Sequence, residues 1–161
     1  ERLGDVIFGV DTEKLEDVVA RALIDADQSV AIVESHTNGY VAGLLHQALA
    51  AQREAGRIVL TRMLPPFETP IDENAVLEQA LEVARTSGAH LVLFAAGASR
   101  EDGSAPGVEP GQTWIVLVTR TQHYSQSYRY GGPAAHTPYW VAYRGLDMLR
   151  RALLGLPLSS S

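Results

Sequence analysis

The sequence predicts an α/β protein: a three-layer α/β/α sandwich around a mostly parallel mixed sheet with at least one antiparallel strand. Short, nearly continuous apolar runs alternate with longer segments whose apolar residues recur every three or four positions, as expected for βαβ units. Two strand patterns then follow each other directly before a last helix pattern, and this predicts at least one antiparallel strand.

The first half of the chain alternates between helix and strand patterns. In order, we expect a helix over 15–23, a buried strand over 29–34, a helix from about residue 39 and a strand over 57–64. Asp11 or Thr12 is the expected cap of the first helix, and Pro65-Pro66 ends the second strand.

The second half opens with a helix that Asp72 caps and Gly88 ends. Its expected inward residues are Val76, Leu77, Ala80, Leu81 and Ala84. The remaining expected elements are strands over 90–96, 113–121 and 127–130, and a helix that opens at Thr137-Pro138. We expect the last two strands to form a hairpin through Gln122-His123-Tyr124.

Length and composition fit one domain over residues 1–158, followed by a disordered tail over 159–161. No apolar run approaches the roughly 20 residues of a membrane span, so we expect no membrane partner. The net charge of −6 and the scattered basic residues argue against a nucleic-acid partner. The absence of cysteine fits a cytoplasmic protein, and the start at Glu1 suggests a piece of a longer polypeptide.

The candidate site is the loop between the first strand and the second helix. Its residues are Glu34, Ser35, His36, Thr37, Asn38 and Gly39. Ligands of open α/β sheets bind beyond the carboxyl ends of the strands, and N–H groups at a helix start favour an anion. Ser35 is the candidate nucleophile, but serine, threonine and asparagine are also the preferred helix caps. Because a lone serine needs a base, capping is the favoured interpretation.

Histidine is the obvious candidate base for Ser35. We expect the side chain of the neighbouring His36 to point away from it, as adjacent side chains do on a strand. The histidines show no metal-ligand spacing, so we expect neither a metal nor a cofactor. The long loop over 97–111 could wrap a ligand at the same edge through Gly97, Asp102 and Gly103, or it could be an excursion without function.

Several segments resemble the CinA C-terminal domain family. Residues 2–9 (Arg-Leu-Gly-Asp-Val-Ile-Phe-Gly) are similar to the family's opening R-L-G-D-x-(aromatic or aliphatic)-x-G, and residues 30–39 to its signature A-x-A-E-S-C-T-G-G. Shorter similarities lie at 97–103, 111–116 and 128–132. In the signature, Ser35, Thr37 and Gly39 match the family's serine, threonine and second glycine, while His36 replaces the cysteine and Asn38 replaces the first glycine.

The resemblance implies hydrolysis of the carboxamide of nicotinamide mononucleotide by a serine that a lysine and a tyrosine assist. Thr61 stands at the tyrosine position and Pro65 near the lysine position. Arg62 keeps its proton and cannot act as a base, and the single lysine, Lys14, lies on the first helix with no reason to approach Ser35. We therefore expect catalysis to be lost or altered, with binding of a nucleotide or another small anion retained.

Two alternatives stay open. The chain could be an active amidohydrolase in which His36, Tyr40 or His90 substitutes for the missing base, or a non-catalytic dimerisation module of a larger protein. The resemblance also implies a homodimer. Its candidate contact residues are Tyr139, Trp140 and Tyr143, near the last helix.

Overall fold

The computed structural model describes residues 14–37, 39–65, 67, 71–97, 111–130 and 137–158. The expected cap at Asp11 or Thr12, the opening motif over 2–9 and the tail over 159–161 lie outside these residues. The helices are α1 (Leu15–Ala26), α2 (Tyr40–Ala51), the short 3₁₀ helix η2 (Ala55–Arg57), α3 (Glu73–Ser87) and α4 (Thr137–Leu154). The strands are β1 (Val30–Glu34), β2 (Ile58–Met63), β3 (Leu91–Gly97), β4 (Gly111–Val118) and β5 (His123–Tyr130).

The five strands form one sheet in the order β2-β1-β3-β4-β5. Strand β1 pairs in parallel with both β2 and β3, whereas β4 is antiparallel to both of its neighbours. The predicted α/β class and mixed sheet are therefore confirmed. Because β1 lies between two parallel strands, the carboxyl ends of β2, β1 and β3 meet at one edge of the sheet.

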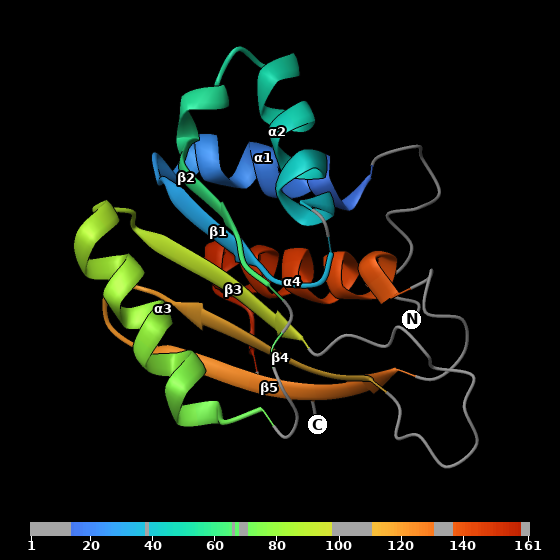
Figure 1. The fold of residues 1–161 in the computed structure, drawn as a ribbon. Coiled ribbons are helices and arrows are strands. Elements are labelled where there is room, and N and C mark those ends of the chain that lie inside the picture. The colour runs from blue at the N-terminus through green and yellow to red at the C-terminus, as the bar shows by residue number, and fades with distance from the viewer. Residues whose placement is uncertain are drawn as a thin grey trace.

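Helices cover both faces of the sheet (Figure 1). Helices α1, α2 and α4 lie on one face, and α3 lies on the other. Successive residues of β1 serve the two layers in turn: Val30 and Ile32 pack in the three-helix layer, and Ala31 and Val33 pack under α3. This explains why β1 reads as a continuous apolar run, since a strand covered on both faces has no solvent side.

Helix α3 begins and ends as predicted. The Asp72 carboxylate accepts a hydrogen bond from the N–H of Asn74 at 3.0 Å, and Gly88 ends the helix with φ = 73°. The expectation that Leu81 faces inward is wrong, because its side chain is exposed. At 100° per residue, Leu81 is turned away from the stripe that Val76 and Ala80 bury.

The hairpin between β4 and β5 is tighter than predicted. His123 and Tyr124 belong to β5 rather than to the turn, which spans residues 119–122. Thr119 closes this turn: its N–H and hydroxyl both donate to the carbonyl of Gln122, and its hydroxyl oxygen accepts from the N–H of Gln122 at 3.1 Å. The turn was predicted at the wrong residues because Thr119 closes it through side-chain hydrogen bonds. Turns are more often recognised in a sequence by glycine or asparagine.

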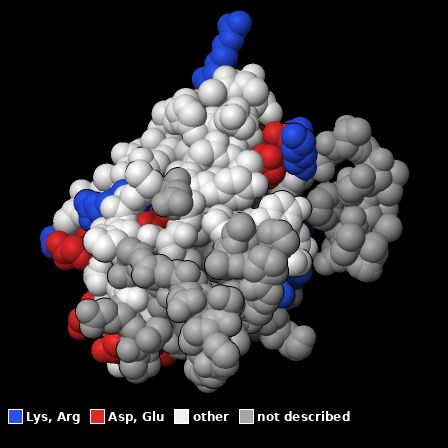
Figure 2. Space-filling view, turned by 45° about the vertical axis from the view of Figure 1, so that its right-hand side comes forward, with Lys and Arg blue, Asp and Glu red and all other residues white. Residues whose placement is uncertain are grey.

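Among the helices that the structure describes, none combines the length and the apolar character needed to cross a lipid bilayer. On the described part of the face in Figure 2, acidic and basic side chains lie in small separate groups and form no continuous basic patch.

Candidate functional site

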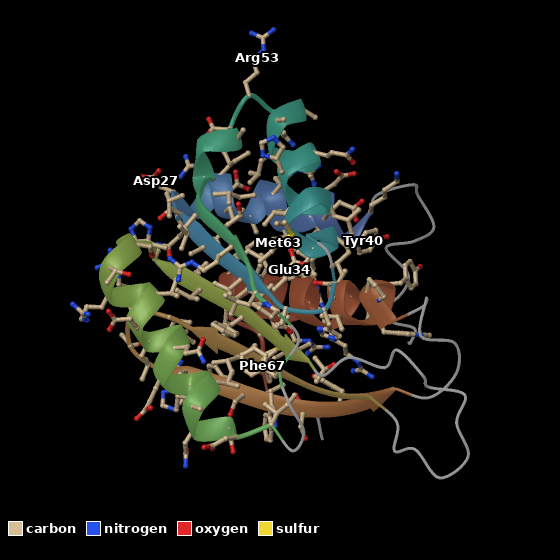
Figure 3. All side chains as sticks on the ribbon, viewed as in Figure 1. Asp27, Glu34, Tyr40, Arg53, Met63 and Phe67 are labelled. Carbon is tan, nitrogen blue, oxygen red and sulfur yellow. The ribbon has the colours of Figure 1, made fainter. Side chains whose placement is uncertain are left out.

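The predicted loop lies where the sequence placed it. Ser35 directly follows β1, a central strand with parallel neighbours on both sides, and α2 begins at Tyr40 after Gly39. Gly39 has φ = 76°, a left-handed conformation that favours glycine, and it caps the helix. Figure 3 shows Glu34, Tyr40 and Met63 near one another at this edge, with Asp27 at the other end of the sheet.

Glu34, the last residue of β1, caps α2 from within the protein. Its carboxyl group is buried and accepts hydrogen bonds from the Val41 N–H at 3.1 Å, the Ala42 N–H at 2.8 Å and the Thr37 hydroxyl. A carboxylate at this position also favours the positive end of the helix dipole. The amides that the sequence offered to an anion are therefore bound to an anion of the protein itself.

Other amides of the same loop are differently placed. The backbone N–H groups of His36, Thr37 and Gly39 make no hydrogen bond with another residue that the structure describes. In this they differ from the Val41 and Ala42 N–H groups of the first turn of α2, which donate to Glu34. Asn38, between them, lies outside the described residues.

Ser35 connects β1 to β3. Its backbone N–H donates to the carbonyl of Ala95 at 3.0 Å. Its hydroxyl oxygen accepts from the Gly97 N–H at 2.7 Å, and the hydroxyl donates to the Gly97 carbonyl at 3.1 Å. Only 8% of the residue is exposed. The hydroxyl therefore uses both its donor and its acceptor on Gly97 of β3. It forms a buried link between the ends of the two strands.

His36 lies closer to Ser35 than expected. The prediction that the two side chains point apart is wrong, because Nδ1 of His36 is 3.4 Å from Oγ of Ser35. Nε2 of the same ring is 3.0 Å from Oγ1 of Thr113, which holds the ring in place. Burial lowers the pKa of His36 to about 4, so the imidazole is neutral near pH 7. The side-chain contacts from Thr113 to His36 and from His36 to Ser35 thus join β4 to the end of β1.

Gly97, the last residue of β3, provides the space for this arrangement. A Cβ atom at this position would lie 2.2–2.4 Å from three atoms of the His36 ring. The ring therefore lies directly on the backbone of Gly97, and a side chain there would displace it. Of the predicted second segment, 97–111, the structure describes only the two ends, Gly97 in β3 and Gly111 in β4, so Asp102 and Gly103 lie outside the described residues.

The positions that replace the family's tyrosine and lysine lie on or after the edge strand. Thr61 and Arg62 are exposed residues of β2, and Pro65 follows the strand. Arg62 lines a cavity of about 350 Å³ together with residues of α3. Lys14 lines another cavity, of about 320 Å³, together with Tyr40 and Tyr139. The only lysine is thus nearer to the start of α2 than the sequence indicated, although its side chain has no hydrogen bond to Ser35.

His90 is not part of this site. It lies at the amino end of β3, where its Nδ1 is 3.0 Å from the N–H of Ser29, at the opposite edge of the sheet from Ser35. Sequence reasoning missed Thr113, which is buried and pairs with Gly97 across β3 and β4. A signal was available, since Thr113 opens the otherwise apolar run Thr-Trp-Ile-Val-Leu-Val.

Comparisons with known proteins support the resemblance. The chain is 28% identical to a competence-damage inducible protein of Alkaliphilus metalliredigens and 25% identical to a CinA-like protein of Dictyoglomus turgidum, with 96% and 97% of this chain covered. It spans 41% of the length of each of these relatives. No protein-family model matches the sequence.

Solved structures share the fold. A CinA superfamily protein from Klebsiella pneumoniae matches with a TM-score of 0.68 at 20% identity, over 88% of this chain and 96% of that one. A competence/damage inducible protein from Agrobacterium tumefaciens matches with a TM-score of 0.60 at 18% identity, over 88% and 97%. The motifs, the relatives and the fold agree: this chain is similar in sequence to CinA-like and competence-damage inducible proteins, and it shares the fold of the solved CinA superfamily structures.

Proposed function

We propose that this CinA-type domain binds a nucleotide or another small anion at the β1–α2 loop without hydrolysing it. The observation that carries this proposal is the hydroxyl of Ser35, which is buried and bonded to both backbone groups of Gly97. A serine nucleophile needs an exposed oxygen and a base that removes its proton. Here the proton is directed to a backbone carbonyl, which is not a base.

The residues around the loop support the loss of hydrolysis. Thr61 stands where the resemblance implies a tyrosine and Pro65 near the place of the lysine, and neither side chain is a general base at neutral pH. The neighbouring Arg62 keeps its proton and cannot act as a base either. Binding is supported by the N–H groups of His36, Thr37 and Gly39, which have no hydrogen-bond partner in the described part of the chain, because such donors at a strand-to-helix loop suit an anionic group. The family resemblance makes nicotinamide mononucleotide the first ligand to test.

The test compares the wild-type chain with Ser35→Ala. We expect no ammonia release from nicotinamide mononucleotide by either protein, and calorimetric titration of the nucleotide should give similar affinities for both. Turnover that disappears in Ser35→Ala would contradict the proposal. If the wild-type chain does not bind the nucleotide, only a structural or assembly role would remain for the domain.

One observation favours a second candidate, an active hydrolase with His36 as the substitute base. The ring is neutral, oriented by Thr113 and 3.4 Å from the hydroxyl of Ser35, so a small rotation of the hydroxyl proton would direct it to Nδ1. Such an enzyme would stay active as the pH falls to about 4, the pKa of the base. It would lose activity in His36→Gln, and Thr113→Val would weaken it without removing the base.

We also propose that the domain forms a homodimer through the start of α4. Tyr139, Trp140 and Tyr143 are 63%, 45% and 44% exposed, which is unusual for three large aromatic residues within five positions. Light scattering at micromolar concentration should give the mass of two chains, and Tyr139→Glu with Trp140→Glu should give one. Leu154→Glu, an exposed position at the other end of α4, is the control. A monomeric wild-type chain would contradict this proposal.

A further inference from the structure

An open cavity lies at the opposite edge of the sheet from Ser35. Its volume is about 680 Å³, within the size range of small-molecule sites. Its walls come from the end of α1, the amino end of β3, the hairpin between β4 and β5, and the end of α4. The loop between β1 and α2 contributes no residue to it, so whatever this cavity holds is separate from the site proposed above.

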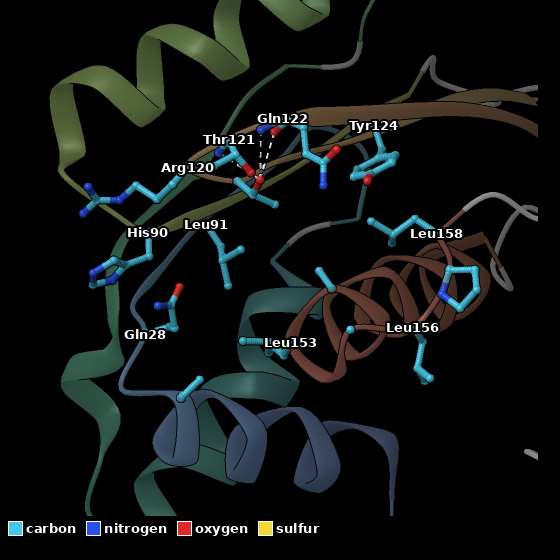
Figure 4. A pocket seen from close by; sticks show the side chains of 15 residues that line it. Gln28, His90, Leu91, Arg120, Thr121, Gln122, Tyr124, Leu153, Leu156 and Leu158 are labelled. Carbon is cyan, nitrogen blue, oxygen red and sulfur yellow. Dashed lines mark hydrogen bonds between the residues drawn. The ribbon is translucent and has the colours of Figure 1, made fainter.

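The walls of this cavity are divided by polarity (Figure 4). Gln28, His90 and Arg120 lie at one end. At the other end, Leu153, Leu156 and Leu158 form an apolar surface, with the ring of Tyr124 above it. This division matches a ligand that has one polar and one apolar end.

The polar end consists of hydrogen-bond donors. The N–H of Ser29 donates to Nδ1 of His90, so Nδ1 is an acceptor and the ring can donate from Nε2. The side chains of Gln28 and Arg120 form no hydrogen bond or ion pair with another described residue. None of the described residues that line the cavity is acidic, although the chain has 19 aspartates and glutamates. A cavity with donors, one cation and no carboxylate favours an anion.

We propose that this cavity is a second ligand site, which takes a small organic carboxylate with an apolar or aromatic body. The carboxylate lies at the end formed by Gln28, His90 and Arg120, and the body lies against Leu153 and Leu156. Arg120 supplies the charge, and the leucines supply the area from which water is removed. This site needs no property of the β1–α2 loop.

The first experiment titrates the 161-residue chain with 4-phenylbutyrate and follows the backbone amide resonances by NMR. We expect saturable shifts confined to Gln28, to His90 and Leu91, and to residues 119–124 and 152–158, with a Kd of order millimolar for a ligand of this size. The neutral analogue 4-phenylbutyramide should bind at least about threefold more weakly, since it lacks the charge that Arg120 recognises.

Three variants separate the two ends of the site. Arg120→Gln should weaken the carboxylate to the level of the amide and leave the amide unchanged. Leu156→Ser, at an exposed position that the fold tolerates, should weaken both ligands by a similar factor. Arg53→Gln is the matched control and should change neither affinity, because Arg53 does not line the cavity and its side chain extends into solvent (Figure 3).

Three results would overturn the proposal. The first is the absence of saturable shifts around the cavity at 20-fold the expected Kd, roughly tens of millimolar. The second is equal affinity for the carboxylate and the amide, which would show that the polar end recognises no charge. The third is an equal effect of Arg120→Gln and Arg53→Gln, which would reduce the role of Arg120 to the net charge of the protein.

Discussion

At the carboxyl end of β1 the polar side chains are bonded to one another, whereas at the amino end of β3 they face an open cavity. Glu34, Ser35 and His36 all have partners inside the protein, and the hydroxyl of Ser35 has two. Around the cavity, the side chains of Gln28 and Arg120 have no such partner among the residues that the structure describes. The residues that resemble the family signature lie at the first edge, whereas the open cavity lies at the second.

The difference shows that a signature motif can be retained for its packing. A strand end, a helix start and a neighbouring strand must be joined at the carboxyl edge, and the side chains of the motif make those joints. Each joint leaves a buried donor or acceptor unpaired when its side chain is removed, and such a group costs about 1–3 kcal/mol. The following predictions test whether the carboxyl edge is held together in this way.

The largest effect is expected from Glu34→Ala. The substitution removes the acceptor for the N–H groups of Val41 and Ala42 and for the hydroxyl of Thr37. We expect the free energy of unfolding to fall by roughly 3–4 kcal/mol, measured by urea denaturation. Glu82→Ala, an exposed glutamate that pairs only with Arg85 on α3, should leave the midpoint unchanged. Equal midpoints for the two variants would mean that Glu34 does not hold α2.

Acid should destabilise the carboxyl edge through His36. Burial lowers the pKa of His36 to about 4, while the unfolded chain binds the same proton near 6.5. Between these values the unfolded state holds more protons, so stability is complete above pH 6.5 and is lost as the pH falls toward 4. The loss should be roughly 2–3 kcal/mol, seen as the difference in unfolding free energy between wild type and His36→Gln at each pH.

The control for this pH profile is His46→Gln, because His46 is exposed on α2. It should follow the wild-type curve over the whole range. A His36→Gln curve that also parallels the wild type between pH 4 and 6.5 would show that the His36 ring is hydrated rather than buried.

Gly97→Ala tests the contact between the His36 ring and the end of β3. The new Cβ would overlap three ring atoms, so the ring must move and lose its hydrogen bond to Thr113. We expect a loss of about 2 kcal/mol in wild type and a loss smaller by at least about 1 kcal/mol in a His36→Ala background. Gly43→Ala is the control: nothing lies within 4 Å of its Cβ, and an alanine inside α2 should stabilise the chain. Equal losses in both backgrounds would place the strain elsewhere.

Most of the fold could be predicted from the sequence because its elements have strong local signals. The apolar run of β1, the cap at Asp72 and the stop at Gly88 act within a few residues, and the structure has all three. The turn between β4 and β5 was misplaced because Thr119 closes it through its side chain, which has no distinctive sequence signature. Leu81 was misplaced because Ala80 and Leu81 are adjacent on the helix and point in different directions. Only Ala80 faces the buried side.

The candidate site was located by the sequence, but its bonding was not. The switch from strand to helix at Ser35 follows from periodicity alone. The partners of Ser35 and His36, however, are Gly97 and Thr113, which lie 62 and 77 positions further along the chain. The order of the strands in the sheet decides which residues make such contacts, and a local sequence pattern does not specify that order. The same holds for the cavity, whose walls come from four separate segments.

Ser35→Ala is expected to have the smallest effect on stability and gives the sharpest distinction between the two roles of this residue. A link between β1 and β3 predicts a loss of about 1–2 kcal/mol, because the Gly97 N–H loses its acceptor while the Gly97 carbonyl keeps the N–H of Phe67 at 2.9 Å. Ser127→Ala, at an exposed position of β5, should cost nothing measurable. A nucleophile predicts the reverse pattern, since catalytic residues are often held at some cost to stability and their removal is neutral or stabilising. Unfolding by urea measures the first outcome and ammonia release measures the second. A destabilised variant, with no ammonia release by either protein, identifies a structural serine. A stable variant that has lost turnover would instead return Ser35 to the catalytic role that the family resemblance implies.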